Sequence, residues 1–510
     1  MIHTFSFDSQ TGELLVAAKV YSDFGSHIPL IRSFSLGANW PPEYPLFPGE
    51  PIRYHYLFYY FVGICEKIGF RLDVILNSLS ALGFFSLLFL LFTLGRKLFN
   101  SVAVGVLSVF LFLFNGSFSF LDFLSTHPWS ADFFHQLFIN RTFPSFAPWN
   151  GSLISAFWNL NIYTNQRHLG LSYAICLLLI YLNYFHRSKL RYLFGFIFGS
   201  LLLLNQAAFI VSAIFFIPAL FNRSLSWKFI LYSVLGALPW LFIYLTTVGA
   251  SYSYPVFHPG YLLPAGSTLL TIFRYWFYNL GLHLFLIPIG FFMAPLPAKK
   301  FALPMFILFI LPNLFQFSAD MINNHKFLNF FLIFGLLYSS AVLVRLWSVS
   351  GFGRIFIILF FPLLILGGIV DFFPVYNDSF LRIKDVSADS DVRFFAQSTP
   401  ADTVVLNDIW FYNPASLAGR KIFNGYSYFT WSYGYNSARR EKITTQIYSG
   451  TSKASICSEL LANKINYVQV DTHPESFLLP TNQIWAREFA QVYSNPNSGL
   501  TIYSVNDNCR

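Results

Sequence analysis

Long uncharged runs of apolar residues constrain this chain more than any other feature of its sequence. Residues 74–95 and 355–370 contain no charged side chain, and about 20 apolar residues cross the hydrocarbon core of a bilayer as a helix. Only 11% of the residues are charged and 55% are hydrophobic, whereas roughly 25% are charged in an ordinary soluble domain. The sequence therefore predicts a polytopic membrane protein whose spanning segments are α-helices.

The apolar runs recur along most of the chain and give a map of about ten predicted crossings. The predicted helices are 74–95, 101–121, 169–185, 192–221, 229–249, 267–293, 301–318, 327–345 and 355–373. The run 192–221 is long enough for one tilted helix or for two short helices that separate near Asn205-Gln206.

Short basic loops decide between these alternatives, because Lys and Arg concentrate in cytoplasmic loops. The basic loops contain Arg96-Lys97, residues 186–191, Arg223 with Lys228, Lys299-Lys300, and Arg345 with Arg354. All of them face one side only if 192–221 crosses twice, so we expect a hairpin or re-entrant pair there. Residues 1–73, 122–168, 250–266, 319–326 and the C-terminal region then lie outside. The net charge of +9 reflects this topology rather than binding to nucleic acid.

The N-terminus does not fit this topology easily. Met1–Val20 has no basic n-region, apolar h-region or cleavage site of a signal peptide. A first loop that lies outside normally follows a membrane helix. We expect that a first membrane helix is missing, through a misassigned start or because the sequence is a fragment; a translocated N-terminal tail is the alternative.

From about residue 374 the sequence becomes polar and predicts a small α/β domain. Thr403–Asn407, Asn466–Asp471 and Leu500–Val505 are predicted strands, and Ser455–Lys464 is a predicted helix. The predicted fold class is an all-α polytopic membrane domain followed by a small extracytoplasmic α/β domain. Its divisions are 1–73 (first loop with interfacial helices), 74–373 (membrane helices) and 374–510. Cys457 and Cys509 lie in the last region, and pairing or free thiols both remain open.

Asp23 and His27 are the first candidates for chemistry. They are four residues apart, which places them on one side of a helical turn, where they can share a proton or a metal ion. The alternative is that Asp23 caps a helix beginning at Phe24 or His27. Further candidates for substrate binding follow in the same loop: Trp40, Tyr44, Arg53 and His55.

Two further loops combine charged and aromatic residues. The loop 122–168 contains Arg141 and ends in Arg167-His168, directly before a predicted helix. Guanidinium and imidazole groups at that position can hold a phosphate. Anchoring of the chain at the membrane interface explains Arg167 and His168 equally well. The loop 318–326 contains Asp320 and Lys326. An outer lysine breaks the topology rule, and a phosphate ligand or a salt bridge to Asp320 explains it.

The layout resembles the GT-C superfamily of integral membrane glycosyltransferases. The residues that carry the resemblance are Ser22–His27 in the predicted outer first loop, followed by a helical body and a trailing outer domain. The run Tyr54–Tyr60 is similar to the Tyr-rich motif of a related, largely uncharacterised prokaryotic family of hydrophobic membrane proteins. Asn413–Arg420 and Asn424-Gly425-Tyr426 are similar to the C-terminal region of such proteins. The chain departs from GT-C proteins in having no helix before the first loop.

This resemblance implies transfer of a sugar from a polyprenyl-phosphate carrier to an acceptor on the outer face, with inversion. Asp23 matches the first-loop acid of the family and would be the base, or a metal ligand if a divalent metal is used. His27 would orient Asp23 or share the metal.

By position rather than by resemblance, Arg167, His168 and Lys326 would neutralise the phosphate. Trp40, Tyr44 and Trp149 offer rings for a sugar, although interfacial packing explains each ring too.

Two other functions remain open. A transporter or lipid flippase usually places ionisable groups or broken helices within the membrane, and Arg274, His283 and Asn205-Gln206 are the residues that suggest this. A non-catalytic protein of polysaccharide assembly is the third possibility. The sequence does not identify the sugar or the acceptor.

Overall fold

The computed structural model describes residues 1–185, 191–221, 226–246, 254–264, 266–349, 351–407, 411–471 and 483–509. These residues form two compact units. The helical unit contains Met1 with residues 79–238 and 253–379, and the mixed unit contains residues 2–78, 239–252 and 380–510. Residues 2–78 therefore belong to the same unit as the C-terminal region, an association that the sequence did not predict.

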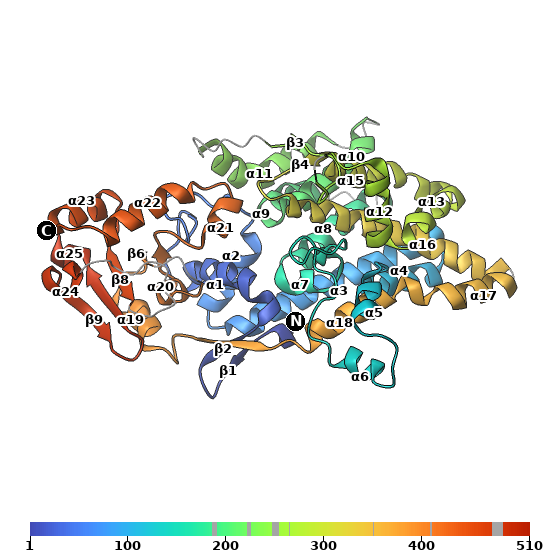
Figure 1. Ribbon diagram of the computed structural model, residues 1–510. Coiled ribbons are helices and arrows are strands. Elements are labelled where there is room, and N and C mark those ends of the chain that lie inside the picture. Colours follow the sequence, from blue (N-terminus) through green and yellow to red (C-terminus); the bar gives the residue numbers. More distant parts are fainter. Residues whose placement is uncertain are drawn as a thin grey trace. The chain divides into compact units, whose positions relative to one another are not determined.

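The helical unit is built from apolar helices that pack on one another (Figure 1). They are α3 (Leu72–Phe99, mostly in this unit), α4 (Val102–Leu113), α5 (Ser119–Thr126), α6 (Phe133–Phe138), α7 (Asn161–Asn165), α8 (Leu169–Phe185), α9 (Arg191–Leu204), α10 (Gln206–Phe221), α11 (Trp227–Thr246), α12 (Leu269–Leu280), α13 (His283–Met293), α14 (Leu296–Lys299), α15 (Ala302–Leu314), α16 (His325–Val349), α17 (Gly351–Phe360) and α18 (Leu366–Tyr376). Short 3-10 turns lie at Ala156–Trp158, Met321–Asn324 and Pro362–Leu364, and the two-residue strands β3 (Val256–Phe257) and β4 (Phe315–Gln316) pair with each other.

Helix α16 is the centre of this unit. In its most apolar stretch 89% of the residues are buried, against 17% for α11. Helices α4, α13 and α15 pack around α16, and Gly290 of α13 lets the two backbones approach, because a Cβ there would lie 2.4 Å from the Tyr338 carbonyl oxygen. The buried helix is apolar on all sides because it faces other helices everywhere.

The number of spanning helices differs from the sequence prediction. Among the described residues, four helices are long and apolar enough to cross a membrane, or up to five if the pair α12 and α13, bent by 85°, counts as one span. The predicted helices 101–121, 267–293 and 355–373 are each interrupted, so ten crossings are not confirmed.

The predicted break in 192–221 is present, with Asn205 lying between α9 and α10. The Phe198 ring lies 4.5 Å from Phe209 and 5.2 Å from Phe216, so the two helices fold back on each other as a hairpin.

Several predicted cytoplasmic loops lie at one end of the helical unit. The Lys97 ammonium lies 5.9 Å from the Phe185 ring, and the Phe185 ring lies 6.4 Å from Phe301. Lys97 is thus close to the end of α8 and to the segment after Lys299-Lys300. The basic residues at 186–190 and 223 lie outside the described residues.

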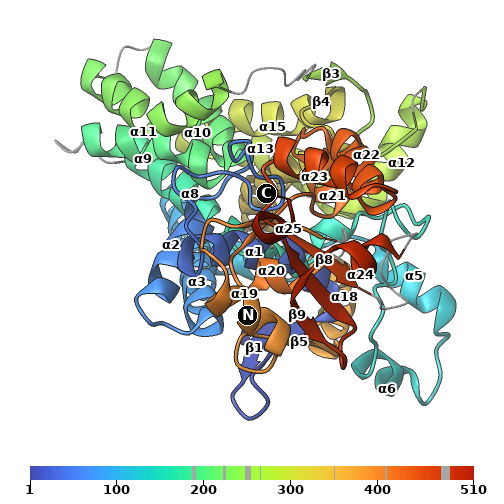
Figure 2. The same cartoon turned by 90° about the vertical axis from the view of Figure 1, so that its left-hand side faces the viewer.

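The mixed unit combines two sheets with short helices (Figure 2). Its strands are β1 (Phe5–Asp8), β2 (Glu13–Ala17), β5 (Phe380–Lys384), β6 (Val404–Leu406), β7 (Lys421–Ile422), β8 (Tyr467–Asp471), β9 (Gln491–Asn495) and β10 (Leu500–Ser504). Its helices are α1 (Tyr21–Ser35), α2 (Leu57–Lys67), α19 (Ser390–Ser398), α20 (Pro414–Leu417), α21 (Ser427–Ser432), α22 (Ser437–Tyr448), α23 (Lys453–Ala462), α24 (Ile484–Glu488) and α25 (Val505–Asn508), with 3-10 turns at Ile2–Thr4 and Ala18–Val20.

The first sheet has the strand order β1-β2-β5, with antiparallel neighbours. Gly12, at φ +74°, supplies the left-handed residue that this hairpin turn requires. The hairpin was not predicted, although strands of alternating polarity flank a turn that ends in Thr11-Gly12. Pairing with β5 joins the two ends of the chain.

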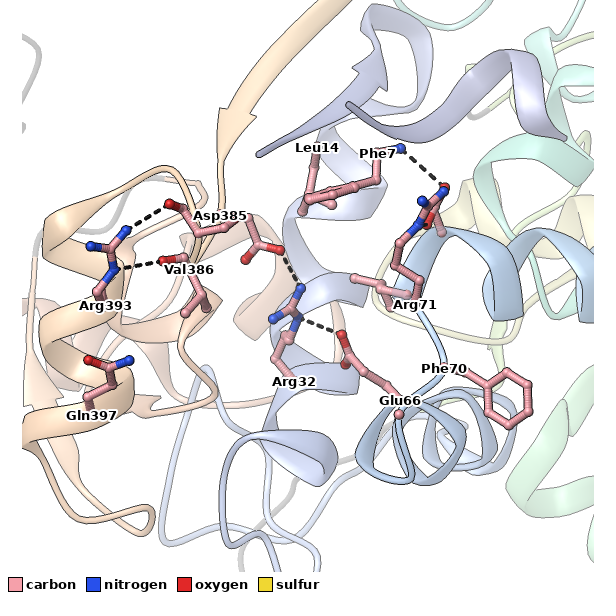
Figure 3. Close-up of a pocket in the computed structure, with 14 residues that line it drawn as sticks. Phe7, Leu14, Arg32, Glu66, Phe70, Arg71, Asp385, Val386, Arg393 and Gln397 are labelled. Carbon is pink, nitrogen blue, oxygen red and sulfur yellow. Dashed lines mark hydrogen bonds and ion pairs between the residues drawn. The ribbon is translucent and has the colours of Figure 1, made fainter. Parts of the chain in front are cut away.

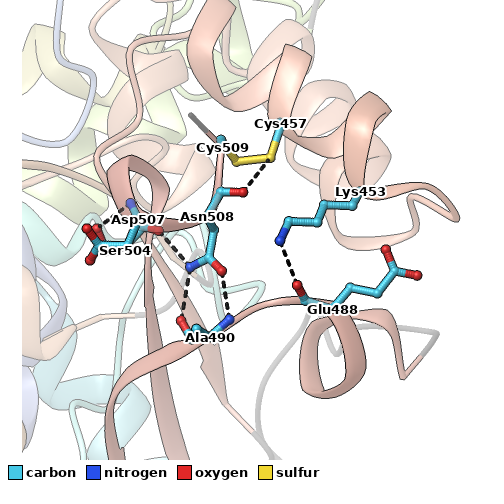
Figure 4. The surroundings of a disulfide bond; sticks show 8 residues. All are labelled: Lys453, Cys457, Glu488, Ala490, Ser504, Asp507, Asn508 and Cys509. Atoms are coloured by element: carbon cyan, nitrogen blue, oxygen red, sulfur yellow. Dashed lines mark hydrogen bonds between the residues drawn. A yellow bond between two sulfur atoms is a disulfide. The ribbon is translucent and has the colours of Figure 1, made fainter.

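The second sheet has the order β7-β6-β8-β10-β9, with β7, β6 and β8 parallel and β10 antiparallel to both of its neighbours. Strands β6, β8 and β10 and helix α23 lie where the sequence predicted strands and a helix. Cys457 of α23 and Cys509 form a disulfide with Cα atoms 5.2 Å apart (Figure 4). The Asn508 side chain donates to the Ala490 and Ser504 carbonyls and holds the C-terminal turn beside it.

Candidate functional site

Asp23 lies in the first turn of α1, a helix whose residues are almost all buried from Phe24 onward. The helix begins at Tyr21 and its N-cap is Val20. Asp23 is therefore inside the helix rather than at its cap, and the prediction that it caps a helix from Phe24 or His27 is wrong. The Asp23 carboxylate lies in the partly exposed first turn of this otherwise buried helix.

Three tyrosines, one buried and two partly buried, lie near Asp23. They are Tyr54, Tyr412 and Tyr433, and burial raises the pKa of each hydroxyl, with a smaller contribution from the negative charge of Asp23. Because these pKa values lie above the ordinary value near 10, the phenols stay protonated at neutral pH. The Tyr54 and Tyr433 hydroxyls can each donate a hydrogen bond to an anion, whereas the Tyr412 hydroxyl already donates to a backbone carbonyl.

The tyrosines also support one another. The rings of Tyr54 and Tyr433 are stacked at 4.2 Å, and the Tyr433 hydroxyl interacts with the side chains of Ser26 and Tyr54. The Tyr412 hydroxyl donates to the Tyr21 carbonyl at 2.5 Å. Residues from α1, from the run before α2 and from the C-terminal part thus converge on one carboxylate.

His27 lies one turn after Asp23 and is only 3% exposed. Its ring stacks on Tyr59 at 4.5 Å and lies 6.0 Å from Phe24. The Tyr-rich run Tyr54–Tyr60 thus lines both residues, with Tyr54 near the carboxylate and Tyr59 on the imidazole. Stacking fixes the orientation of His27.

Asp23 and His27 are the residues of this site that could bind a metal ion. In the described part of the chain, no three His, Cys, Asp or Glu side chains come together, so a structural zinc site with four protein ligands has no counterpart there. Magnesium is usually held by one or two carboxylates together with substrate phosphate, and Asp23 would be its protein ligand here.

The carboxyl ends of strands β6 and β7 hold buried polar side chains that the sequence did not predict. Asn407 directly follows β6 and Asn424 lies just beyond β7, and both side chains are buried. Neither amide atom of Asn424 has a hydrogen-bond partner among the described residues. Carboxyl ends of parallel strands are where open α/β sheets bind ligands. The Asn424-Gly425-Tyr426 motif carries part of the sequence resemblance, but its spacing gave no sign of this role.

The other first-loop candidates have mixed environments. Trp40 is 77% exposed, whereas Tyr44 is 1% exposed, and its ring packs on Tyr435 at 5.2 Å. Arg53 donates to the Gly434 carbonyl and to Glu50, and its backbone amide donates to the Tyr435 hydroxyl. These contacts give Tyr44 and Arg53 roles in packing. The buried His55 ring lies 3.5 Å from the Tyr54 ring and supports the tyrosine cluster.

A basic patch lies in the helical unit, where α8 and α16 begin side by side. The Tyr173 hydroxyl donates to the Lys326 carbonyl at 3.3 Å, and its ring lies 4.0 Å from Phe330. Arg167 and His168, just before α8, are therefore at the same end of the unit as Lys326. Two parallel helix N-termini add partial positive charge, so this end favours an anion.

Burial distinguishes the members of this patch. Arg167 and His168 are at most 1% exposed and Lys326 is 7% exposed. The Lys326 ammonium lies 3.4 Å from Asn323 Oδ1, and Asp320 accepts from the Ile322 amide and begins the turn before α16. Basic groups buried in this way make strong charge-assisted hydrogen bonds.

Arg141 and Trp149 lie in the loop between α6 and the turn Ala156–Trp158 of the helical unit. Both are exposed, and the Trp149 ring packs against Phe146 at 5.0 Å. The Trp149 ring also lies 5.8 Å from Phe157, whose ring stacks at 4.3 Å on His325, the first residue of α16. No contact among the described residues links Arg141 to that helix end.

A separate cavity of about 640 Å³ lies within the mixed unit (Figure 3). Its charged walls are paired with each other: Arg32 contacts Glu66 at 3.2 Å and Asp385 at 2.7 Å. Arg393 donates to the carbonyls of Val386 and Ser387. The cavity thus joins α1, α2 and the segment after β5 through ion pairs, and its charges are already compensated.

Comparison with protein-family models and with curated proteins gives no match. Three solved structures of the oligosaccharyltransferase of the archaeon Archaeoglobus fulgidus are similar. Two of them are a complex with an inhibitory peptide and a dolichol-phosphate and a form tethered to an acceptor peptide. Each is 13% identical to this chain and has a TM-score of 0.39, and the alignment covers 98% of this chain and 71% of the archaeal chain. The apo form is 12% identical, with coverages of 90% and 66% and a TM-score of 0.40. Oligosaccharyltransferases are GT-C glycosyltransferases, the superfamily that the sequence resembles, but likeness at this level carries no argument about activity.

Proposed function

We propose that this chain is an inverting membrane glycosyltransferase that moves a sugar from a polyprenyl-phosphate-linked donor to an acceptor on the outer face, with Asp23 as the general base. The observation that carries the proposal is the position of Asp23 in the first turn of the buried helix α1, near Tyr54, Tyr412 and Tyr433. A single carboxylate among neutral donors is an arrangement suited to proton transfer. The resemblance of the sequence to GT-C proteins supports the same reading.

In the proposed step, an acceptor hydroxyl or amide attacks the anomeric carbon of the donor sugar. A bond forms between the acceptor atom and this carbon, and the bond between the carbon and the phosphate oxygen breaks. The acceptor proton passes to Asp23, and the carrier phosphate leaves with the bonding electron pair. Attack from the face opposite the leaving group inverts the configuration. His27, held by Tyr59, positions Asp23 and does not itself react.

The proposal assigns the carrier phosphate to the basic patch of Arg167, His168 and Lys326. The charge that develops on a departing phosphate needs donors in place before the reaction. Buried arginine and lysine beside two helix N-termini supply them. The assignment has a test that is independent of Asp23.

Location on the outer face is also part of the proposal. The Cys457–Cys509 disulfide supports it, because disulfides persist in oxidising compartments. The loops with Lys97 and with Lys299-Lys300, which meet at one end of the helical unit, support a cytoplasmic face there.

The direct test is Asp23→Asn, assayed in membranes for release of polyprenyl phosphate from a panel of labelled lipid-linked sugars. Asparagine keeps the shape of the side chain but takes up no proton. We expect kcat to fall by about 10²- to 10⁴-fold with little change in the KM for the donor. Asp402→Asn, an exposed carboxylate of the same unit, is the control and should leave kcat unchanged. Wild-type turnover by Asp23→Asn would reject the base.

The phosphate assignment is tested by Arg167→Gln and Lys326→Gln. Loss of one charge-assisted hydrogen bond, worth about 1.5–3 kcal/mol, should raise the donor KM roughly 10- to 100-fold. Arg141→Gln, an exposed arginine of the same unit, is the control. An unchanged donor KM in both patch variants would remove the patch from the mechanism and leave Asp23 unaffected.

A transporter or lipid flippase is the second candidate function. The bend of 85° between α12 and α13, followed directly by the buried His283, is a feature that such proteins share. Reconstituted vesicles distinguish the two, because a flippase moves the labelled lipid across the bilayer without releasing its phosphate.

A further inference from the structure

Three interrupted helices meet inside the helical unit. Residues 114–118 connect α4 to α5, and this segment packs against the α12–α13 break and against α18. A Cβ on Gly281 would lie 2.0 Å from the Gly116 carbonyl oxygen, and one on Gly367 would lie 2.3 Å from the Ser117 carbonyl oxygen. Glycine at these positions is therefore required by the close approach of unwound backbone. Helices α5 and α18 lie side by side at this point (Figure 1).

Asp371 of α18 points into this junction and is 5% exposed. Its Oδ2 atom lies 3.3 Å from the Ser119 hydroxyl, which is also 3.4 Å from the Gly367 carbonyl. Its Oδ1 atom has no hydrogen-bond partner among the described residues. The carboxylate is thus buried with one long hydrogen bond and with the Asn115 side chain as the other polar group facing it.

No cation compensates this carboxylate in the described part of the chain, where Asp371 forms no ion pair. The ionisable group that acts on Asp371 is a second carboxylate, Asp122, whose side chain accepts from the Ser145 hydroxyl. A buried charge without a partner is costly. An ionised Asp371 would therefore need a positive charge beside it, either a bound cation or a proton.

Oxygen atoms dominate the surroundings of Asp371. The Ser117 hydroxyl lies 3.3 Å from that of Ser119, and Asn115 Oδ1 accepts from the Ser117 amide at 3.0 Å. Carboxylate, hydroxyl and free carbonyl oxygens at broken helices are the groups that hold sodium ions in membrane proteins.

We propose that Asp371, with the Asn115–Ser119 segment, binds a monovalent cation, sodium being the ion that such an oxygen site suits. The site does not depend on the proposed glycosyl transfer. Its role would be to lock α5 and α18 together at the junction, because one ion would contact both elements.

The test uses the purified full chain in detergent and measures the thermal unfolding midpoint. Sodium chloride is titrated against choline chloride at constant ionic strength, with lithium and potassium chloride as further arms. A ligand that binds only the folded state raises the midpoint with concentration. We expect a saturating rise of about 2 °C or more in sodium relative to choline at pH 8.

Asp371→Asn should abolish the sodium response, and Asp132→Asn, an exposed carboxylate of the same unit, should retain it. If Asp371→Asn does not give folded protein, Ser119→Ala takes its place and should move the sodium midpoint to a concentration at least about tenfold higher. Equal stability in sodium and choline overturns the proposal, as does a sodium response retained by Asp371→Asn. Stabilisation by low pH alone, without a cation effect, would show that Asp371 is neutralised by a proton instead.

Discussion

Arg32 offers the sharpest test of the electrostatics of the mixed unit. Its guanidinium lies between two carboxylates, 3.2 Å from Glu66 and 2.7 Å from Asp385, and all three side chains are at most 10% exposed. Replacing Arg32 by Met keeps most of the apolar volume of the side chain. The substitution leaves both carboxylates buried without a counter-charge.

The expected cost follows from this burial. Breaking a buried ion pair by removing one partner costs about 3–5 kcal/mol. At about 2–4 °C per kcal/mol for a unit of this size, the unfolding midpoint should fall on the order of 10 °C. Arg382→Met is the matched control, because Arg382 also bridges two carboxylates, Asp8 and Glu13, but is 56% exposed. An exposed pair is worth about 0–1 kcal/mol, so this control should shift the midpoint only slightly.

The pH dependence gives a second check. Burial raises the pKa of Glu66 in the folded protein, and Arg32 opposes that rise. The folded state then binds the Glu66 proton more tightly than the unfolded chain, in which glutamates have a pKa of about 4.3. The stability linked to Glu66 is therefore fully present below the unfolded pKa and is lost as the pH rises through the folded pKa. Without Arg32 the folded pKa rises further, so the deficit of Arg32→Met should be larger at pH 8 than at pH 5.

Calorimetry or fluorescence of the purified protein in detergent measures these midpoints. Adding Glu66→Gln and Asp385→Asn to Arg32→Met should restore most of the loss, because no unpaired charge then remains. The reasoning fails if Arg32→Met costs no more than Arg382→Met, or if the triple variant is no more stable than the single one.

Three further substitutions have expected outcomes. Replacing both Cys457 and Cys509 by Ser removes a disulfide that spans 52 residues and should lower the free energy of unfolding by up to about 4 kcal/mol. The double variant should have a lower unfolding midpoint, and adding a reductant should no longer change that midpoint. Burial lowers the pKa of Arg440 to about 10, and its guanidinium lies 3.5 Å from an aromatic ring; Arg440→Lys should cost about 1–2 kcal/mol in the same assay. Gly281→Ala, at φ +55° and with its Cβ directed at the Gly116 carbonyl, should cost about 2 kcal/mol or more and lower the yield of folded protein.

Hydrophobic pattern and charge were enough to predict much of the helical unit. The helices α3, α8, α11, α15 and α16 lie within a few residues of their predicted ranges. The break near Asn205 followed from the distribution of basic loops. The interruptions at 114–118, at Gly281 and at Pro362–Leu364 were not predicted, although Asn115-Gly116-Ser117 and Pro362 are residues that favour turns. The close backbone contacts that a Cβ on Gly281 or Gly367 would violate depend on distant segments.

In the candidate site too, local spacing was predicted from the sequence, whereas contacts between distant residues were not. The spacing of Asp23 and His27 on one turn was readable, as was a Tyr-rich run in the same region. That Tyr412 and Tyr433 lie near Asp23 and Tyr54 was not predicted, since they follow Asp23 by 389 and 410 positions in the sequence. Tyr44 was predicted to be available for a sugar, but it packs on Tyr435, a partner that no local pattern indicates.

The sequence by itself determined that the chain is rich in apolar helices, where its basic loops fall, and which acid and imidazole share a helical turn. These properties are local, since each depends on residues within a few turns of one another. The tertiary structure alone decided that the N-terminal hairpin pairs with β5, that Cys457 meets Cys509, and that Asp371 is buried without an ion pair to any residue that the structure describes. Such features depend on contacts between distant segments, and a periodic pattern carries no information about which distant segments will meet.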